Sequence, residues 1–379
     1  MFLFILGRQP EIGVAELRAV FGAAELILPN VARVATDATP DIDILGGTRK
    51  VGRVIWEGAA SDSGFERILF ERLSALPAGK ITLGVSCYGS GADAKIAMKT
   101  ALSLKQKLGR SVRVLPNAAA EISDAATLGN RLGTTPHKVE LMLVRAGQRL
   151  IIAELIGVQN LNAYTFRDRS RPKRDARVGM LPPKLAQIMI NLARADDHSL
   201  CAPLLDPFCG TGVVLQEAAL MGVGVYGSDI EPRMIEYSGK NLDWLARTHH
   251  VKFDQKLEVG DATTHTWQTP IGAVVSETYL GQPYTVQPAP KKLRQNMATC
   301  NLIIEKFLGN IAPQLTPGTP LCLAVPVWFT GGKIHHLPIT SINSLPPDFE
   351  YRAGQKPLIY RRENQIVGRE LLVLARRRT

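Results

Sequence analysis

The chain has 379 residues, of which 45% are hydrophobic and 21% charged, so it is long enough for two or three domains with sizeable cores. Its 45 Lys and Arg outnumber its 34 Asp and Glu, and the net charge of +11 is compatible with a nucleic-acid partner without requiring one. The five cysteines form no CxxC pair, which argues against a disulfide framework or a zinc site.

The first 60 residues predict a small unit that combines strands with one helix. Residues 2–6 are apolar, residues 11–21 carry apolar side chains at helical spacing, and residues 24–28 and 49–56 have strand character. Polar residues follow the opening apolar run at once, so that run predicts a first strand rather than a signal peptide. No apolar run reaches the roughly 20 residues that span a bilayer, and we therefore expect a soluble, cytoplasmic protein.

Residues 61–163 predict a second unit that again mixes strands and helices. The expected strands are residues 81–88 and 110–116, and the expected helices are residues 92–108 and 123–132. Two further apolar runs, at residues 139–145 and 150–156, flank an Ala-Gly-Gln turn and predict a β-hairpin. The two N-terminal units share this general pattern but no sequence repeat.

A strongly basic segment follows at residues 164–179 and predicts a linker. Within eleven positions, only Asp168 and Asp175 oppose six cationic residues, which are Arg167, Arg169, Arg171, Lys173, Arg174 and Arg177. Such a segment is either an exposed, solvated connector or a basic strip that lies along a phosphate backbone. On the second interpretation, the candidate RNA-binding residues are Arg167, Arg169, Arg171, Lys173 and Arg174.

From residue 180 to the C-terminus, the pattern alternates between helices and strands. The expected helices are residues 185–193, 212–221, 232–245 and 291–308, and the expected strands are residues 203–206, 223–229, 257–259, 273–277 and 320–326. Strands that alternate with helices of this length predict a parallel, doubly wound α/β sheet.

Three acidic residues stand at the ends of successive strands in this domain. They are Asp206, Asp229 and Asp261, and in a doubly wound sheet ligands bind beyond these carboxyl ends. Asp229 can accept both hydroxyls of a ribose, and Asp261 can accept the exocyclic amine of an adenine. Each acid alone is a weak signal, because a strand-end Asp commonly caps the next helix. Together they predict a nucleoside cofactor.

The turn after the first of these strands reads Asp-Pro-Phe-Cys-Gly-Thr-Gly at residues 206–212. Small residues there bring bare backbone and helix N-terminal amides close to a ligand. The turn lacks the Gly-x-Gly-x-x-Gly of dinucleotide-binding enzymes, which argues against an oxidoreductase. Upstream, residues 177–186 either pass over the end of the cofactor opposite its base or simply start a helix. The candidate cofactor-binding residues are Asp206, Phe208, Gly210, Gly212, Asp229, Ile230, Asp261, Ala262 and Pro183.

The same turn resembles motif I of S-adenosylmethionine-dependent methyltransferases that methylate amines. Nearly the whole chain is similar to the THUMP-containing tRNA guanosine-N2 methyltransferases, which typically act on guanosine 10. The likeness rests on residues 2–17, 139–144, 153–157, 167–172, 181–186 and 206–212. It implies a ferredoxin-like domain at residues 1–60, a THUMP domain at residues 61–163 and a Rossmann-like methyltransferase domain at residues 180–379. It also implies S-adenosylmethionine as cofactor and tRNA as partner, with the THUMP domain gripping the acceptor end.

The resemblance breaks at the end of the fourth strand, where such enzymes normally carry Asp/Asn-Pro-Pro-Tyr/Phe. An exocyclic base amine is a poor nucleophile, so an acid or amide oxygen accepts its N–H groups while an aromatic ring stacks on the base. This chain reads Ser276-Glu277-Thr278-Tyr279 and lacks both prolines. A gapless match places Glu277 at the acid, whereas matching Tyr279 to the aromatic places Ser276 there. We favour Glu277 as the amine acceptor and Tyr279 as the residue that stacks on the base or gates the pocket.

Other interpretations stay open at this point. The altered fourth-strand motif is also expected of a tRNA-binding protein that keeps the fold but has weakened or lost its chemistry. Motif I is shared with amino-methyltransferases that act on DNA or protein, although the basic linker and the THUMP-like unit argue against them. The resemblance does not decide between a chain that acts alone, a homodimer and a complex with an activating partner subunit.

Overall fold

The computed structural model describes residues 1–60, 64–175, 180–194, 202–352, 357–363 and 365–378. These residues form two compact units, the first made of Met1–Leu17 and Ala23–Ala163 and the second of Arg18–Gly22 and Tyr164–Thr379. Two parts of the sequence predictions lie outside the described residues. They are Cys201 and residues 176–179, which include Arg177. Within the described ranges, no helix is both long enough and apolar enough to cross a membrane.

The first unit is built on one mixed sheet of eight strands in the order β2-β3-β1-β4-β8-β7-β5-β6. Its elements are β1 (Phe2–Leu6), α1 (Pro10–Phe21), β2 (Glu25–Leu28), β3 (Val31–Val34), β4 (Thr48–Ala59), α2 (Gly64–Ser74), β5 (Ile81–Gly89), α3 (Ala94–Lys107), β6 (Val112–Val114), α4 (Asp124–Gly129), β7 (Lys138–Ala146) and β8 (Arg149–Val158). The hairpin expected from the sequence is present, because β7 and β8 pair in antiparallel fashion with Gly147 at positive φ in the turn. Strand β4 pairs with β8, so both expected N-terminal domains contribute strands to the same sheet.

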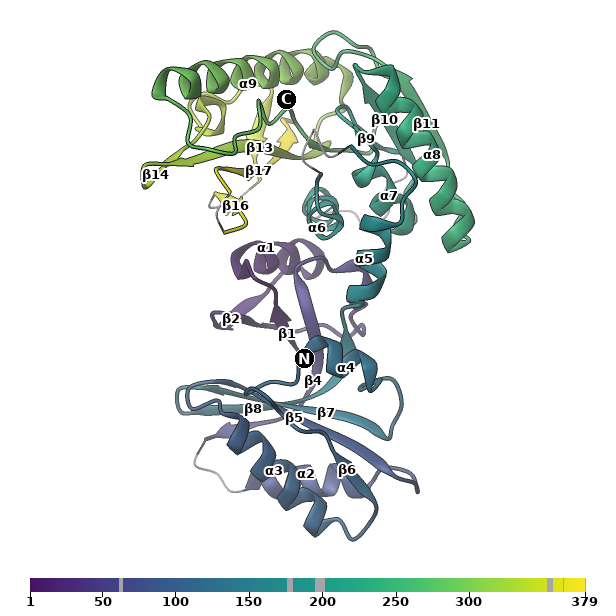
Figure 1. Ribbon diagram of the computed structural model, residues 1–379, viewed down its shortest axis with the longest axis vertical. Helices are drawn as coiled ribbons and strands as arrows, with labels where there is room; N and C mark the ends of the chain where they lie inside the picture. The colour runs from purple at the N-terminus through teal and green to yellow at the C-terminus, as the bar shows by residue number, and fades with distance from the viewer. Residues whose placement is uncertain (61–63, 176–179, 195–201, 353–356, 364, 379) are drawn as a thin grey trace. The chain divides into compact units, whose positions relative to one another are not determined.

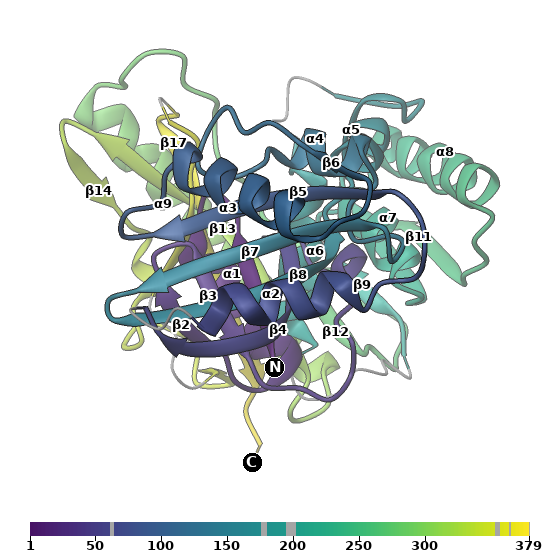
Figure 2. The same cartoon turned by 90° about the horizontal axis from the view of Figure 1, so that it is seen from below.

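Helices α2 and α3 cover one face of this sheet, as Figure 2 shows in front of β5, β7 and β8. Their buried side chains, including Leu69, Leu73 and Leu104, pack on Leu83 and Leu141 of the strands. Two elements here were not expected from the sequence, namely α2 and β3, and the helix expected at residues 123–132 ends at Gly129. Short amphipathic segments of this kind carry too few periodic positions to be recognised, and burial against the sheet stabilises them.

The second unit contains the doubly wound sheet, in the order β11-β10-β9-β12-β13-β17-β15. Its elements are α5 (Leu161–Arg169), α6 (Pro183–Ala193), β9 (Leu204–Asp206), α7 (Val213–Leu220), β10 (Val225–Asp229), α8 (Pro232–His249), β11 (Gln255–Val259), β12 (Ala273–Glu277), α9 (Pro290–Ile311), β13 (Pro320–Thr330), β14 (Lys333–His335), β15 (Phe349–Tyr351), β16 (Leu358–Tyr360) and β17 (Val367–Arg376). Strands β9 to β13 pair in parallel, as predicted, whereas β17 runs antiparallel between β13 and β15. Helices α6 and α9 lie on opposite sides of β13 (Figure 1).

The strand order reverses at β9, which lies between β10 and β12. Strands that leave this point in opposite directions open a crevice beyond their carboxyl ends, where loops diverge to either face. The residues that end these strands, Asp206, Asp229, Val259 and Glu277, therefore lie along one edge of the sheet. The burial of Leu205, which packs in the core with residues of α9, holds β9 in the centre.

Candidate active site

A cavity of about 1110 Å³ opens at this edge of the sheet. Polar and apolar residues from the strand ends, the loop after β12, α9 and the start of β17 enclose it. They include Met180, Leu181, Asp206, Phe208, Gly210, Thr211, Asp229, Ile230, Asp261, Ala262, Glu277, Thr278, Tyr279, Tyr284, Lys306, Gln365 and Arg369. A concave space of this size, with a few convergent polar groups, suits a nucleoside-sized ligand with room for a second molecule.

The turn at residues 206–212 adopts a backbone that requires glycine at two positions. Gly210 and Gly212 have φ of 51° and 78°, in the left-handed region. A Cβ on Gly210 would meet nothing closer than 4.0 Å, so this part of the backbone is open to the cavity. A Cβ on Gly212 would lie 2.8 Å from Ser238 Oγ of α8. Gly212 is not among the lining residues, so it serves the packing of the turn on α8 rather than direct contact.

Asp206 is fully buried beneath this turn. Its Oδ1 accepts hydrogen bonds from the hydroxyl of Ser276, at 2.6 Å, and from the backbone amide of Phe208, at 3.2 Å. Burial raises the pKa of Asp206 to about 7, while these two bonds oppose the shift. The carboxyl can therefore exchange its proton near neutral pH and ionise when a cationic group approaches.

Asp229 presents its carboxylate at the neighbouring strand end. Its Oδ2 accepts from the amide of Gly210 at 2.9 Å, and its Oδ1 accepts from the amide of Glu231 at 3.0 Å. Each carboxylate oxygen has two acceptor sites, so each keeps one for a ligand hydroxyl. Burial raises the pKa of Asp229, and the two amide bonds lower it. The geometry thus retains the pair of acceptors that a ribose needs.

The far end of the cavity is bounded by Ile230, Asp261 and Ala262. The side chain of Ile230 is 61% exposed and lies at the cavity, where a flat ring can cover it. Asp261 Oδ1 accepts from the amide and hydroxyl of Thr263, at 2.9 and 2.8 Å, which leaves its other oxygen free of bonds among the described residues. These features match the adenine end expected from the sequence.

The segment before α6 was expected to contact the cofactor through Pro183, but other residues of this segment line the cavity. Pro183 is the buried first residue of α6 and does not line the cavity, whereas Met180 and Leu181 do. The Pro-Pro pair therefore starts a helix, because proline at its first positions sacrifices no hydrogen bond. The two apolar side chains before it supply the contact.

Glu277 ends β12 at the cavity with 16% of its side chain exposed. It is ion-paired with Arg369 Nε of β17, a residue that was not among the predicted site residues. Burial raises the pKa of Glu277, and the charge and hydrogen bond of Arg369 lower it. Tyr279 also lines the cavity and is 41% exposed. Ser276 does not line it, because its hydroxyl points to Asp206, and this corrects the alternative match that placed Ser276 at the acid.

The basic segment is not an exposed connector throughout, which corrects the expectation from its charge. Arg167 lies on α5 and forms an ion pair of 2.8 Å with the buried Glu217 of α7. Arg171 is also buried, with its guanidinium 3.5 Å from Asp168. Arg169 and Arg174 are exposed and Lys173 is partly so, and the RNA-binding role of these three stays a prediction. Charge alone does not show which cations a neighbouring helix neutralises.

Several lining residues are not among the predicted site residues, and Tyr284, Gln365 and Arg369 are three of them. The Tyr284 hydroxyl and Gln365 Oε1 are buried atoms without a hydrogen-bond partner among the described residues. Such atoms are costly unless a ligand or water satisfies them. Gln365 and Arg369 come from the C-terminal part of the chain and reach the cavity because β17 pairs with β13. No local sequence motif predicts that pairing.

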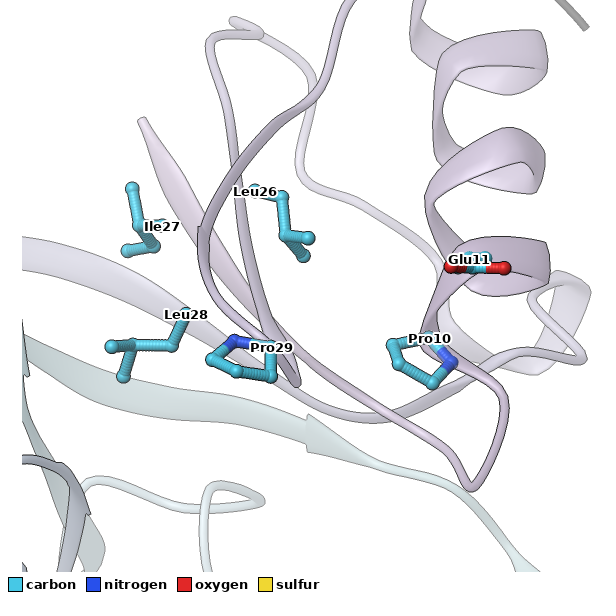
Figure 3. A pocket seen from close by; sticks show the side chains of 6 residues that line it. All are labelled: Pro10, Glu11, Leu26, Ile27, Leu28 and Pro29. Carbon is cyan, nitrogen blue, oxygen red and sulfur yellow. The ribbon is translucent and has the colours of Figure 1, made fainter. Parts of the chain in front are cut away.

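A second hollow, of about 480 Å³, lies in the first unit (Figure 3). Pro10 and Glu11 at the start of α1 face Leu26, Ile27, Leu28 and Pro29 of β2 and the turn after it. Glu11 is the one ionisable residue of this lining. The hollow therefore presents no set of groups that could carry out chemistry.

Comparison with known proteins finds a family match within the second unit. Residues 171–299, which contain β9 to β12 and the start of α9, match the family described as UPF0020: RMKL-like, methyltransferase domain. This segment is similar to that methyltransferase family. The methyltransferase domain is therefore Rossmann-like, as the sequence predicted, and the resemblance is confirmed for this part of the chain. The crystal structure of TrmN from Thermus thermophilus shares the fold, with a TM-score of 0.54 at 16% identity over 99% of both chains.

Two sequence relatives are named tRNA (guanine(10)-N2)-dimethyltransferase. The protein of Methanothermobacter thermautotrophicus is 33% identical over 150 residues, which are 39% of this chain and 39% of that protein. The protein of Pyrococcus abyssi is 37% identical over 124 residues, or 32% of this chain and 34% of that protein. The matched segments thus span little more than a third of each relative.

Proposed function

We propose that the chain transfers a methyl group from S-adenosylmethionine to an exocyclic base amine of tRNA, the N2 of guanosine 10. The observation that carries the proposal is the single cavity that joins the three strand-end acids to Glu277 and Tyr279. The names of the two relatives support guanosine N2 and position ten. The exposed cations Arg169 and Arg174 support RNA binding, and a tRNA substrate would place the protein in the cytoplasm.

The lining residues fit the proposed cofactor. Asp229 offers two acceptors to ribose hydroxyls, Asp261 offers one to the adenine amine, and Ile230 offers an apolar face to the ring. The open backbone of Gly210 and the buried carboxyl of Asp206 lie between these groups and Glu277. Bound there, S-adenosylmethionine supplies a methyl group activated by a positively charged sulfur.

Glu277 is assigned the methyl-acceptor side of the site. Its free carboxylate oxygen accepts an N–H of the amine, which orients the nitrogen lone pair toward the methyl carbon. As the new N–C bond forms, the bond between sulfur and the methyl carbon would break and its electron pair would return to sulfur, leaving a neutral thioether. The nitrogen becomes positively charged, and the carboxylate stabilises that charge before it takes the proton. Tyr279 holds the base by stacking, since its exposed ring lies at the cavity.

The test is incubation with labelled S-adenosylmethionine and unmodified tRNA, followed by nucleoside analysis. We expect label in N2-methylguanosine or N2,N2-dimethylguanosine. The variant Glu277→Ala should lose activity by about 10²-fold, whereas the control Glu350→Ala, at an exposed glutamate, should retain it. Binding of tRNA without transfer of label would favour the tRNA-binding alternative or a need for a partner subunit. Full activity of Glu277→Ala would refute the role of Glu277.

A further inference from the structure

Arg369 is placed beside Glu277 by the pairing of three strands. Glu277 of β12 lies opposite Ala324 of β13, and Ala324 lies opposite Leu371 of β17. Side chains in lateral register share one face of a sheet, and residues two apart on a strand share it as well. Arg369 is therefore on the same face as Glu277. On the intervening strand, the small Ala324 lies opposite Glu277 and Pro326 lies opposite Arg369, and the guanidinium reaches Glu277 past these two residues.

The ion pair uses only one nitrogen of Arg369 and one carboxylate oxygen of Glu277. Arg369 Nε donates to Glu277 Oε1, while no bond within the described residues occupies Glu277 Oε2 or the two terminal nitrogens of Arg369. Both side chains are largely buried, with 8% of Arg369 and 16% of Glu277 exposed, and both line the cavity. The planar guanidinium holds a carboxylate in a defined plane in a way that a flexible cation does not.

The ion pair between Arg369 and Glu277 compensates for the absence of the two prolines after Glu277. In the expected motif, the prolines make the turn rigid and the acid is an Asp or Asn. Here the chain after Glu277 reads Thr278-Tyr279, and the glutamate has one more rotatable bond. An unheld glutamate would spend little time in the orientation that transfer needs.

We propose that Arg369 is a positioning residue for methyl transfer, which holds the Glu277 carboxylate so that its second oxygen faces the acceptor amine. The proposal rests on the proposed function. Arg369 replaces the rigid Pro-Pro turn with a contact between strands. Arg369 takes no part in binding S-adenosylmethionine, which is assigned to residues at the ends of β9, β10 and β11.

The test compares Arg369→Gln, Arg369→Lys and the control Arg294→Gln, at an exposed arginine of α9. Cofactor affinity by calorimetry should stay within about twofold for all three. We expect kcat of Arg369→Gln to fall about 10–100-fold with little change in KM for tRNA. Arg369→Lys should recover the charge but not the orientation, so its kcat should remain low. The control should match the wild type.

The pH profile separates positioning from a structural role. Glu277 also interacts electrostatically with the buried carboxyl of Asp206, whose pKa burial raises to about 7, so Glu277→Gln is measured in parallel. Without Arg369, the pKa of Glu277 should rise, and the acid limb of the rate should move to higher pH in Arg369→Gln but not in Arg369→Lys. In the Glu277→Gln background, the Arg369→Gln change should have little further effect.

The outcomes distinguish the two proposals. If the wild type transfers methyl groups and folded Arg369→Gln has normal kcat and an unshifted acid limb, the positioning role is wrong and the function stands. Additive losses in the double variant would also overturn it. If the wild type binds S-adenosylmethionine but methylates no tRNA, the proposed function fails, and the positioning role fails with it. If Arg369→Gln does not fold, the kcat and pH profile of Arg369→Lys decide.

Discussion

The hydroxyl of Ser276 donates a 2.6 Å hydrogen bond to Asp206 Oδ1, across 70 positions of sequence. Ser276 directly precedes Glu277, and Asp206 begins the turn that carries Gly210. One buried bond therefore connects the strand of the proposed amine acceptor to the strand of the proposed cofactor turn. The two halves of the candidate site are held in register by a side-chain contact between β9 and β12.

Removal of that bond should weaken both the fold and the site. Ser276 is completely buried, so Ser276→Ala leaves the largely buried Asp206 carboxyl with one hydrogen-bond donor fewer. We expect a loss of about 1–3 kcal/mol in the free energy of unfolding and weaker binding of S-adenosylmethionine. Urea unfolding and calorimetry measure the two effects. The exposed Ser344→Ala serves as control, and unchanged values for both variants would contradict the link.

Asp206 should make stability depend on pH in an unusual direction. Because burial raises its pKa from 3.8 to about 7, the folded chain holds a proton that the unfolded chain has released. The contribution of this group is fully present below pH 3.8 and is lost as the pH rises to about 7. The free energy of unfolding should therefore fall across this window relative to Asp206→Asn, with a slope of at most about 1.4 kcal/mol per pH unit.

Urea titrations between pH 4 and pH 8 measure this difference. The exposed Asp254→Asn is the control, since it should track the wild type at every pH. If wild type and Asp206→Asn gave parallel curves, Asp206 would be ionised in the folded protein throughout, and its raised pKa would be ruled out.

Two glycines allow backbone strain to be separated from crowding in the cofactor turn. Gly212 and Gly222 have similar φ, 78° and 76°, but a Cβ on Gly212 meets Ser238 Oγ at 2.8 Å while one on Gly222 meets nothing within 4 Å. Both alanine variants should lose about 1–2 kcal/mol from the left-handed backbone. Gly212→Ala should lose more, because Ser238 would have to give up its bond to the carbonyl of Gly210.

Thermal unfolding and cofactor titration test this pair. Gly222→Ala should bind S-adenosylmethionine like the wild type, whereas Gly212→Ala should bind it more weakly. Equal behaviour of the two variants would mean that the turn does not depend on its packing against α8.

The basic segment should divide into structural and RNA-binding cations. Arg167→Gln leaves the buried Glu217 without its partner, so we expect a loss of about 3–5 kcal/mol in stability. Arg169→Gln, at an exposed position, should leave stability unchanged but lower tRNA affinity and reduce its salt dependence. Unfolding curves and tRNA binding at several salt concentrations measure both. Normal tRNA affinity of Arg169→Gln at low salt would remove Arg169 from the RNA-binding surface.

The sequence by itself determined the features that depend on local pattern. The alternation of helices and strands from residue 180 onward, the glycine turn at residues 206–212 and the acids at strand ends each follow from a few neighbouring residues, because periodicity, turn geometry and strand ends are local properties. The position of Glu277 at the end of β12 follows in the same way, and the structure places it at the cavity.

The tertiary structure decided which groups meet. Arg369 reaches Glu277 because β17 pairs with β13, Ser276 reaches Asp206 across β12 and β9, and Glu217 of α7 neutralises Arg167. Each contact joins residues that lie 50 to 92 positions apart. Charge and hydrogen-bonding capacity are visible in a sequence, but whether a partner satisfies them depends on strand order and helix packing, which no short segment encodes.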